Sequence, residues 1–423
     1  MSRLKKELGI AQGAGLMSTS LLGAGVFVVP ALAASIAGYW SLLAWALLIV
    51  LALPIALTFA LLGRKYPHAG GTPHMVGQAM GLRLEKMTAF LYLAVLPVAV
   101  PAGLELAAGF WLSVFELNSW LILAVKLGTL LAVLLLGLGG ARCSGNVQLW
   151  IALCISLLII SLWWAGGIHL TDALMPESEE RAYQTIMPAL AVMFWCFVGI
   201  EAFTHMGEEF KHPQRDFPLA LLFGVLVAGL IYWGCATAVV KFGFYGTQLE
   251  NARSIPALTE YLLGSQTQWV AAAVGYMACF ASINTYLQGF SRLLWSMAEE
   301  GSLDQIRLQS LSVLSDRQLP IRALWTVIVA SALSAIIAHF SSMTLESLIC
   351  FSNGNLIVIY FLCMLAGLKL LTGWQRAVAF ASAILCLLVL VALGSNMLYV
   401  FALVAGFLIF ERLCPSTYCT KEK

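Results

Sequence analysis

The chain has 423 residues, of which 61% are hydrophobic and only 10% are charged, and its mean hydropathy is +0.90. A soluble domain is about 45–50% apolar and about 25% charged, so this composition excludes an ordinary water-soluble fold and indicates a protein of the lipid bilayer. The formal net charge is +2 and no basic stripe is interleaved with aromatic residues, which excludes nucleic-acid binding as a main function.

Apolar runs separated by polar segments predict twelve membrane-spanning helices. A span needs about 20 apolar residues, and lipid offers no hydrogen-bond partner to irregular backbone, so each run has to be helical. We therefore expect an all-α membrane protein. Its predicted spans are residues 10–34, 39–62, 87–114, 121–138, 147–166, 186–206, 219–241, 267–297, 322–340, 345–368, 375–393 and 397–411.

Lysine and arginine residues predict which helix ends face the cytoplasm. With the N-terminus inside, 19 of the 23 Lys and Arg residues fall in cytoplasmic segments. Arg181, Lys241 and Arg253 fall outside, and Lys126 falls within the fourth span. Because positive residues concentrate on the cytoplasmic side, we expect both termini to be cytoplasmic. The inner loops would be 64–86, 207–218 and 298–321, and the long outer loops would be 167–185 and 242–266.

Two of the predicted spans contain glycine where a continuous helix would avoid it. The first carries Gly23, Ala24 and Gly25, and the sixth carries Gly199 two residues before Glu201. A glycine inside a helix costs up to about 1 kcal/mol of helix propensity, and tight helix packing is the alternative explanation. Glycine-interrupted spans in corresponding positions of two halves are typical of transporters built from an inverted repeat.

The spacing of the two interrupted spans predicts how the repeats are arranged. They lie five helices apart, and because five is odd the second copy would cross the membrane in the opposite direction. We expect repeats of five helices at 1–167 and 168–368, followed by two helices and a tail at 369–423. Free N–H groups at a helix break bind carboxylates, and free carbonyl groups bind ammonium groups or cations. An amino acid carries both groups.

Four segments, each weak alone, together resemble the signature motifs of the amino acid–polyamine–organocation (APC) superfamily. They are the break Gly23-Ala24-Gly25-Val26-Phe27, the segment Arg64 to Gly71, the segment Gly207 to Pro218, and Ser291 to Gly301 at the end of the eighth span. The similarity covers the whole chain in order. It implies a LeuT-like fold in which helices 1 and 6 are broken. Ala24 departs from the pattern, because this position often carries a hydroxyl group in the superfamily.

Further stretches are similar to one branch of this superfamily, the inner-membrane exporters of methionine and branched-chain amino acids. They are Val192 to Gly199, Glu209-Phe210-Lys211, Tyr232 to Cys235 and Leu4 to Gly9. The resemblance implies a secondary transporter of small neutral amino acids that exports L-methionine, leucine, isoleucine and valine across the bacterial inner membrane by alternating access. We expect no cofactor and no metal, and a monomer or a homodimer.

Two other functions stay open. An importer or exchanger of the same fold, including a polyamine antiporter, would need spare carboxylates in the membrane, and only Glu201 and Glu105 qualify. A membrane-embedded enzyme has less support, because the spans hold no His/Asp cluster and no GxSxG-like nucleophile motif.

The substrate site follows from the breaks and from the resemblance. Main-chain N–H groups at the first break would hold the substrate carboxylate, and carbonyl groups at the second break would hold the ammonium group. Aromatic side chains would line the pocket and suit an apolar substrate. The expected substrate-binding residues are Gly23, Ala24, Gly25, Trp195, Phe197, Gly199, Tyr286 and Asn284.

Glu201 has two possible roles. Ionising a carboxylate in mid-membrane costs several kcal/mol unless it is paired, so such a residue is by default a functional candidate. In related antiporters the glutamate at this place gates transport or senses protons. Alternatively, Glu201 braces the broken helix, with His205 one turn away as a partner. Proton antiport, amino-acid exchange and facilitated diffusion are all compatible with the sequence.

We also expect an ion pair inside the membrane between Glu105 in the third span and Lys126 in the fourth. The two spans form a hairpin, so at a rise of 1.5 Å per residue both groups lie within about 15 Å of the outer surface. Opposite charges in a membrane tend to pair, because each alone is costly. Alternatively, Lys126 extends outward to water.

Overall fold

The computed structural model describes residues 4–23, 25–112, 114–116, 118–174, 183–301, 308–341, 343, 345–392 and 398–413. Within these residues the chain is helical, and one isolated bridge joins Leu8 to Phe210. The α-helices are α1 (Ile10–Leu22), α2 (Gly25–Ala37), α3 (Trp40–Lys65), α4 (Gly71–Met80), α5 (Leu82–Leu93), α6 (Leu96–Leu112), α7 (Ser119–Leu138), α8 (Gly140–Ala165), α9 (Leu170–Leu174), α10 (Ile186–Met193), α11 (Ile200–Thr204), α12 (Pro213–Phe242), α13 (Gln248–Leu263), α14 (Gln268–Glu299), α15 (Ile321–Phe340), α16 (Leu345–Leu370), α17 (Trp374–Ala392) and α18 (Leu398–Leu413).

The helices follow the predicted spans closely. Among the described residues, ten helical runs are long and apolar enough to cross a membrane, and the bent pair α1–α2 raises the number to eleven. The remaining predicted span coincides with α18, whose apolar part, Leu398–Ile409, is shorter than the others. The chain is therefore a multi-pass α-helical membrane protein.

Three helices form where the sequence predicts loops. Helix α4 lies in the predicted inner loop 64–86, and α9 and α13 lie in the predicted outer loops 167–185 and 242–266. The start of α13 is a capping box, in which the Thr247 side chain accepts from the Glu250 N–H and the Glu250 carboxylate accepts from the Thr247 N–H. Such a box satisfies two of the four N–H groups that a helix start leaves free.

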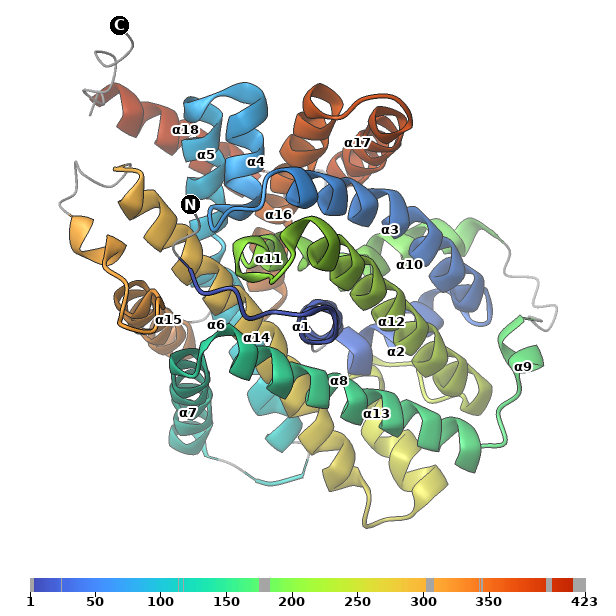
Figure 1. Ribbon diagram of the computed structural model, residues 1–423. Helices are drawn as coiled ribbons and strands as arrows, with labels where there is room; N and C mark the ends of the chain where they lie inside the picture. The colour runs from blue at the N-terminus through green and yellow to red at the C-terminus, as the bar shows by residue number, and fades with distance from the viewer. Residues whose placement is uncertain are drawn as a thin grey trace, which may run out of the picture.

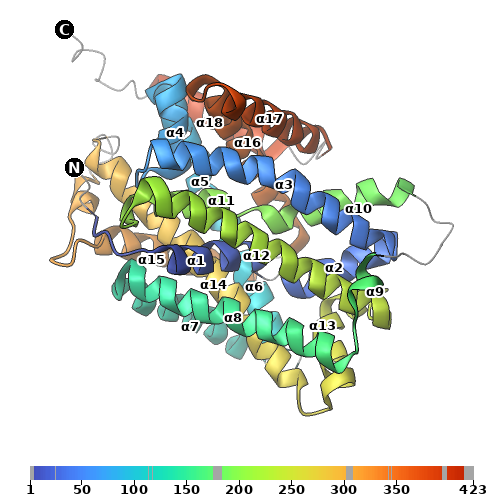
Figure 2. The same cartoon turned by 45° about the vertical axis from the view of Figure 1, so that its right-hand side comes forward.

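Helix α1 lies at the centre of the molecule. It packs against α12, α8 and α14, and Figure 1 shows it nearly end-on with these three around it. Helices α3, α12, α1 and α8 run side by side as a layer, which Figure 2 shows from the second direction. Helices α17 and α18 lie at the periphery, against α3, α5 and α16.

Both glycine-containing spans are interrupted. Helices α1 and α2 meet at an angle of 44°, and Gly23 between them has φ +37°. In the sixth span α10 tightens into a 3₁₀ turn, Phe194–Phe197, and the chain is then extended at Val198 before Gly199, with φ +135°, leads into α11. A left-handed backbone of this kind favours glycine, which has no Cβ to clash.

The expected ion pair between Glu105 and Lys126 is confirmed. The Lys126 ammonium group on α7 donates to the Glu105 carboxylate on α6. The Lys126 side chain is 4% exposed, whereas that of Glu105 is 47% exposed. Removing Glu105 would therefore leave a buried charge, whereas removing Lys126 would leave a half-exposed one.

This difference predicts unequal effects of two substitutions on stability. Glu105→Gln leaves a buried ammonium group without its counter-ion, so it should lower the free energy of unfolding by about 3–5 kcal/mol. Lys126→Met leaves a half-exposed carboxylate that water can solvate, so it should cost less. The double variant Lys126→Met/Glu105→Gln should recover most of the loss. Unfolding curves in detergent test this, and additive effects of the two changes would contradict it.

Candidate substrate site

A cavity lies where the two broken spans meet. Its walls come from the first break, from the 3₁₀ turn of the sixth span, and from α6, α12, α14 and α16. The residues that line it are Ser20, Leu21, Leu22, Gly23, Gly25, Ala99, Val100, Ala102, Gly103, Leu106, Trp195, Cys196, Val198, Tyr232, Cys279, Ser282, Ile283, Tyr286, Ile349, Ser352 and Leu356.

Side chains from neighbouring helices satisfy the carbonyl groups at the end of α1. The Tyr232 hydroxyl on α12 lies 3.0 Å from both the Leu21 and the Leu22 carbonyl oxygens and donates to them. The Ser282 hydroxyl on α14 donates to the Ser20 carbonyl at 3.2 Å. Since lipid cannot satisfy these carbonyl groups, Tyr232 and Ser282 stabilise the break.

The start of α2 faces the same cavity through Gly25. The first N–H groups of a helix have no partner inside it and carry a partial positive charge, so they suit a carboxylate. A Cβ atom on Gly25 would lie 2.6 Å from the Tyr232 hydroxyl oxygen, which is closer than atoms can approach. The glycine therefore keeps the backbone within reach of a ligand.

Glu201 and Tyr360 hold the second break. One Glu201 carboxylate oxygen accepts from the Gly199 N–H at 2.9 Å, and the other accepts from the Tyr286 hydroxyl at 2.7 Å. The Tyr360 hydroxyl on α16 accepts from the N–H groups of Gly199 and Ile200, both at 3.2 Å, and donates to the Phe197 carbonyl at 3.1 Å. Glu201 is fully buried, so its carboxylate depends on these partners.

The two breaks also touch each other. The Ser20 hydroxyl donates to the Gly199 carbonyl at 3.1 Å. A Cβ atom on Gly199 would lie 2.8 Å from the Ser20 hydroxyl oxygen. Movement of one broken helix therefore acts directly on the other.

The structure brings four of the expected site residues to the cavity wall: Gly23, Gly25, Trp195 and Tyr286. Gly199 shapes the second break without lining the cavity, and Ala24 lies outside the described residues.

Phe197 and Asn284 lie outside the cavity lining in this structure. The Phe197 ring faces the Tyr232 ring, with centroids 6.4 Å apart. The Asn284 amide turns toward α8 and donates to the Ser144 hydroxyl at 2.7 Å. Neither side chain is placed to contact a ligand in the cavity.

Several residues of the site had no local signal in the sequence. Tyr232 and Tyr360 are single tyrosines in apolar runs, and their role appears only when α12 and α16 pack against the breaks. Gln148 on α8 accepts from both Thr19 on α1 and Thr285 on α14, so it joins three helices through one amide. The one available hint was a glutamine near the start of the predicted span 147–166.

The cavity lining contains no charged side chain among the described residues. Glu201 reaches the cavity only through the Tyr286 hydroxyl, and Glu105 lines a different pocket on the other side of α6. The cavity therefore combines main-chain dipoles and a few hydroxyl groups with apolar walls.

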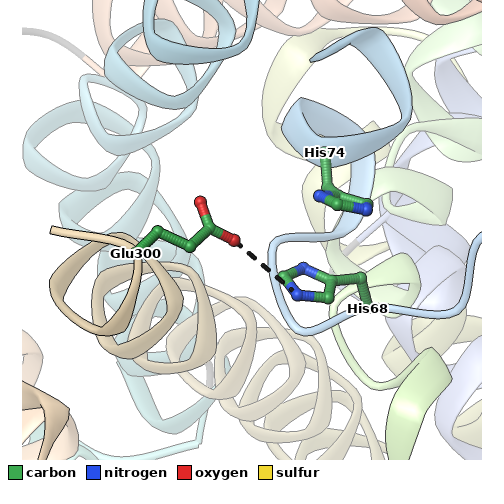
Figure 3. Close-up of side chains that lie close together, drawn as sticks. All are labelled: His68, His74 and Glu300. Atoms are coloured by element: carbon green, nitrogen blue, oxygen red, sulfur yellow. Dashed lines mark ion pairs between the residues drawn. The ribbon is translucent and has the colours of Figure 1, made fainter. Parts of the chain in front are cut away.

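A second group of ionisable side chains lies between the start of α4 and the end of α14. In the described part of the chain, the ligand atoms of His68, His74 and Glu300 gather within 4.8 Å of one another, and Figure 3 shows Glu300 reaching toward His68. Burial and the neighbouring His74 together lower the pKa of His68 to about 4. His68 is therefore neutral at pH 7.

The geometry of this group favours a polar contact over a metal centre. The Gly70 N–H donates to His68 Nδ1 at 3.1 Å, so the ring proton is on Nε2, which faces Glu300 at 3.7 Å. The His68 and His74 rings stack, with centroids 3.9 Å apart. Nitrogen lone pairs lie in the ring planes, so two stacked rings do not direct them to one point.

Comparison with known proteins agrees with this architecture. The sequence model of the amino acid permease family matches residues 8–420. The chain is 48% identical over 406 residues to the L-methionine/branched-chain amino acid exporter YjeH of Escherichia coli, which covers 96% of each protein.

More distant relatives include the uncharacterized amino acid permease YecA of Bacillus subtilis, 26% identical over 382 residues and 89% of each chain. The putrescine transporter PotE of Haemophilus influenzae is 24% identical over 314 residues, which is 71% of this chain and 70% of that protein. The match to the family spans nearly the whole chain, including both breaks and the helices that hold them. This protein therefore belongs to the amino acid permease family of the APC superfamily.

Proposed function

We propose that this protein is a secondary transporter that exports L-methionine, leucine, isoleucine and valine across the bacterial inner membrane by alternating access. The observation that carries the proposal is the uncharged cavity at the meeting point of two broken helices. The Escherichia coli relative, an L-methionine/branched-chain amino acid exporter that is 48% identical, supports the same substrates and direction.

The cavity suits a neutral amino acid with an apolar side chain. The N–H groups at the start of α2 offer a site for the carboxylate, and carbonyl groups of the sixth-span turn offer one for the ammonium group. Val100, Leu106, Ile283, Ile349 and Leu356 supply apolar wall for the side chain. Each buried CH₂ group contributes about 0.8 kcal/mol, so leucine should bind more tightly than alanine by about 2 kcal/mol.

A polyamine substrate fits the cavity less well, although relatives of this chain include a putrescine transporter. A diamine carries two positive charges, which need carboxylates when water is removed. Glu201 is held by Gly199 and Tyr286, and the carboxylate of Glu105 lies behind α6. A substrate without net charge requires neither of these two carboxylates in the cavity.

The arrangement of the membrane crossings belongs to the same proposal. We infer twelve crossings, made of inverted repeats at 1–167 and 168–368 and two helices in 369–423, with both termini in the cytoplasm. Two interrupted spans that lie five helices apart and contact each other through Ser20 and Gly199 support the repeat. The bias of Lys and Arg supports the orientation.

Transport in membrane vesicles tests the function. Right-side-out vesicles loaded with labelled leucine or methionine should lose the label faster when they contain this protein, and unlabelled valine should compete. Labelled putrescine and lysine should leave at the background rate, because the cavity offers them no carboxylate. Faster efflux of putrescine than of leucine would contradict the proposal.

Substitution of the break glycines should abolish transport without preventing insertion into the membrane. In Gly25→Val the new side chain meets the Tyr232 hydroxyl, and in Gly199→Val it meets Ser20 in a backbone conformation that valine does not adopt. We expect leucine efflux to fall by at least about tenfold, as expected for a loss of more than about 1.4 kcal/mol of binding. Gly109→Val is the matched control, because its Cβ would meet nothing within 4 Å. Wild-type efflux in Gly25→Val would remove this glycine from the site.

Glu201 is proposed to gate the cycle through the second break. Protonation from the inner side would weaken its hold on the Gly199 N–H, so transport should respond to the inner pH. Glu201→Gln cannot titrate, and we expect it to flatten that response. If the variant keeps the wild-type profile against inner pH, Glu201 only braces the helix.

The orientation predicts which loops an impermeant thiol reagent can reach. In a cysteine-free variant, a single cysteine at Gly246 or Gln266 should be labelled in intact spheroplasts, whereas one at Gln214 or Asp316 should be labelled only after the membrane is opened. All four positions are outside the predicted spans. Labelling at Gln214 in intact spheroplasts would reverse the topology.

A further inference from the structure

A second polar pocket lies on the opposite side of α6 from the substrate cavity. It encloses about 260 Å³, which is ample for several water molecules, since one needs only about 10–15 Å³. Pro101 and Glu105 of α6 line this pocket, whereas Ala102, Gly103 and Leu106 of the same helix line the substrate cavity. Helix α6 is therefore a wall that the two cavities share.

A chain of polar contacts leads into this pocket from the end of the helices. The exposed Ser119 hydroxyl lies 2.9 Å from His339 Nε2, and His339 Nδ1 lies 3.4 Å from the Lys126 ammonium group. Lys126 in turn donates to Glu105. An ammonium group can only donate, so His339 Nδ1 accepts, the imidazole is neutral, and its proton lies on Nε2 facing Ser119.

The described side chains around this group come from four helices and from Ser341 and Met343, which follow α15. Helix α6 supplies Glu105, α7 supplies Lys126 and Ser119, and α15 supplies His339. Helix α16 contributes only Leu345 and Leu348 to the lining. Among these side chains the titratable groups are thus one carboxylate, one ammonium group and one imidazole, with a net charge of zero.

Stability alone does not require these groups. Well-packed apolar residues often replace a buried ion pair without loss of stability, so a buried lysine in a membrane is a candidate for function.

Ala102 of the substrate cavity and Leu348 of this pocket belong to one small apolar cluster with Val98. A shift of α6 at Glu105 is therefore transmitted to the wall of the substrate cavity.

We propose that Glu105, Lys126 and His339 form a proton-binding site, separate from the substrate cavity, through which the outer pH controls export. The proposal rests on the proposed transport function and on the orientation given above, which places this end of α6, α7 and α15 on the outer side. The ligand is a proton from the outer water, and its acceptor is His339 Nδ1.

Proton binding changes the contacts of Lys126. The new N–H on Nδ1 faces the ammonium group 3.4 Å away, so Lys126 loses an acceptor and meets a like charge. The net charge of the group rises from zero to one. Repulsion between His339 and Lys126 separates the ends of α15 and α7, and Glu105 shifts with α6 to compensate. The wall beside the substrate then loosens on the outer side, and release to the outside is faster.

The test uses the purified full-length protein in liposomes, with the inner pH held constant and labelled leucine inside. Lowering the outer pH from about 7.5 to about 5.5 covers the range in which imidazoles generally gain a proton, so wild-type efflux should rise by at least about threefold. His339→Gln should remove this rise, because glutamine can accept from Lys126 and donate to Ser119 but does not titrate. The double variant Lys126→Met/Glu105→Gln should also remove it.

One control makes the outcome specific. Lys241→Met/Asp172→Asn removes another ion pair of the predicted outer side, with partners 2.7 Å apart and about 30% exposed, and should keep the full rise.

The possible failures are distinguishable. A full rise in His339→Gln, or wild-type efflux that ignores the outer pH, overturns the proton site and leaves the transport function standing. A wild-type protein that moves no leucine at any pH overturns the proposed function itself.

Discussion

The structure depends on one constraint: inside a membrane, every main-chain N–H and carbonyl group needs a partner within the protein. Two spans of this chain break their helices and so release several such groups at mid-membrane depth. Tyr232 satisfies carbonyl groups at the first break, and Tyr360 and Glu201 satisfy N–H groups at the second. The helices that carry these side chains, α12 and α16, have to pack against the breaks. The cavity is therefore a consequence of how the breaks are stabilised.

The same constraint governs where charge can lie. A lone charge in the membrane is costly. Two pairs of charged side chains in the described part of the chain avoid this cost by contacting each other. Arg292 pairs with Glu209 near the C-terminal end of α14, and Lys126 pairs with Glu105 behind α6. The substrate cavity is lined by main-chain dipoles, a few hydroxyl groups and apolar side chains. Such a lining suits a neutral amino acid. Helix α6 keeps the charged pocket and the neutral cavity apart while it touches both.

Close approach of backbone explains the glycines at the centre of the molecule. Gly25 leaves room for Tyr232, and Gly199 leaves room for Ser20. In each case a methyl group would force apart the atoms that make the break stable. The cost of glycine in helix propensity is offset by hydrogen bonds that no other residue would permit.

The sequence by itself determined the fold class, the spans, the two breaks and the ion pair of Glu105 with Lys126. These properties follow from local composition: apolar runs of membrane length, glycine in mid-span, and two opposite charges in neighbouring helices of a hairpin. The capping box at Thr247 is also a local signal for helix α13. We predicted a loop there because the segment is not apolar enough for a span.

Only the tertiary structure decided which side chains surround the cavity. Asn284 and Phe197 lie in the right spans, but the rotation of each helix about its axis turns Asn284 toward Ser144 and Phe197 toward Tyr232. Tyr360 is more than 150 residues from the break that it holds, and no local pattern marks such a contact. A span can be predicted from its own residues, because it depends on local composition. The face that the helix turns to the substrate cannot, because helix rotation and long-range packing depend on all neighbouring helices together.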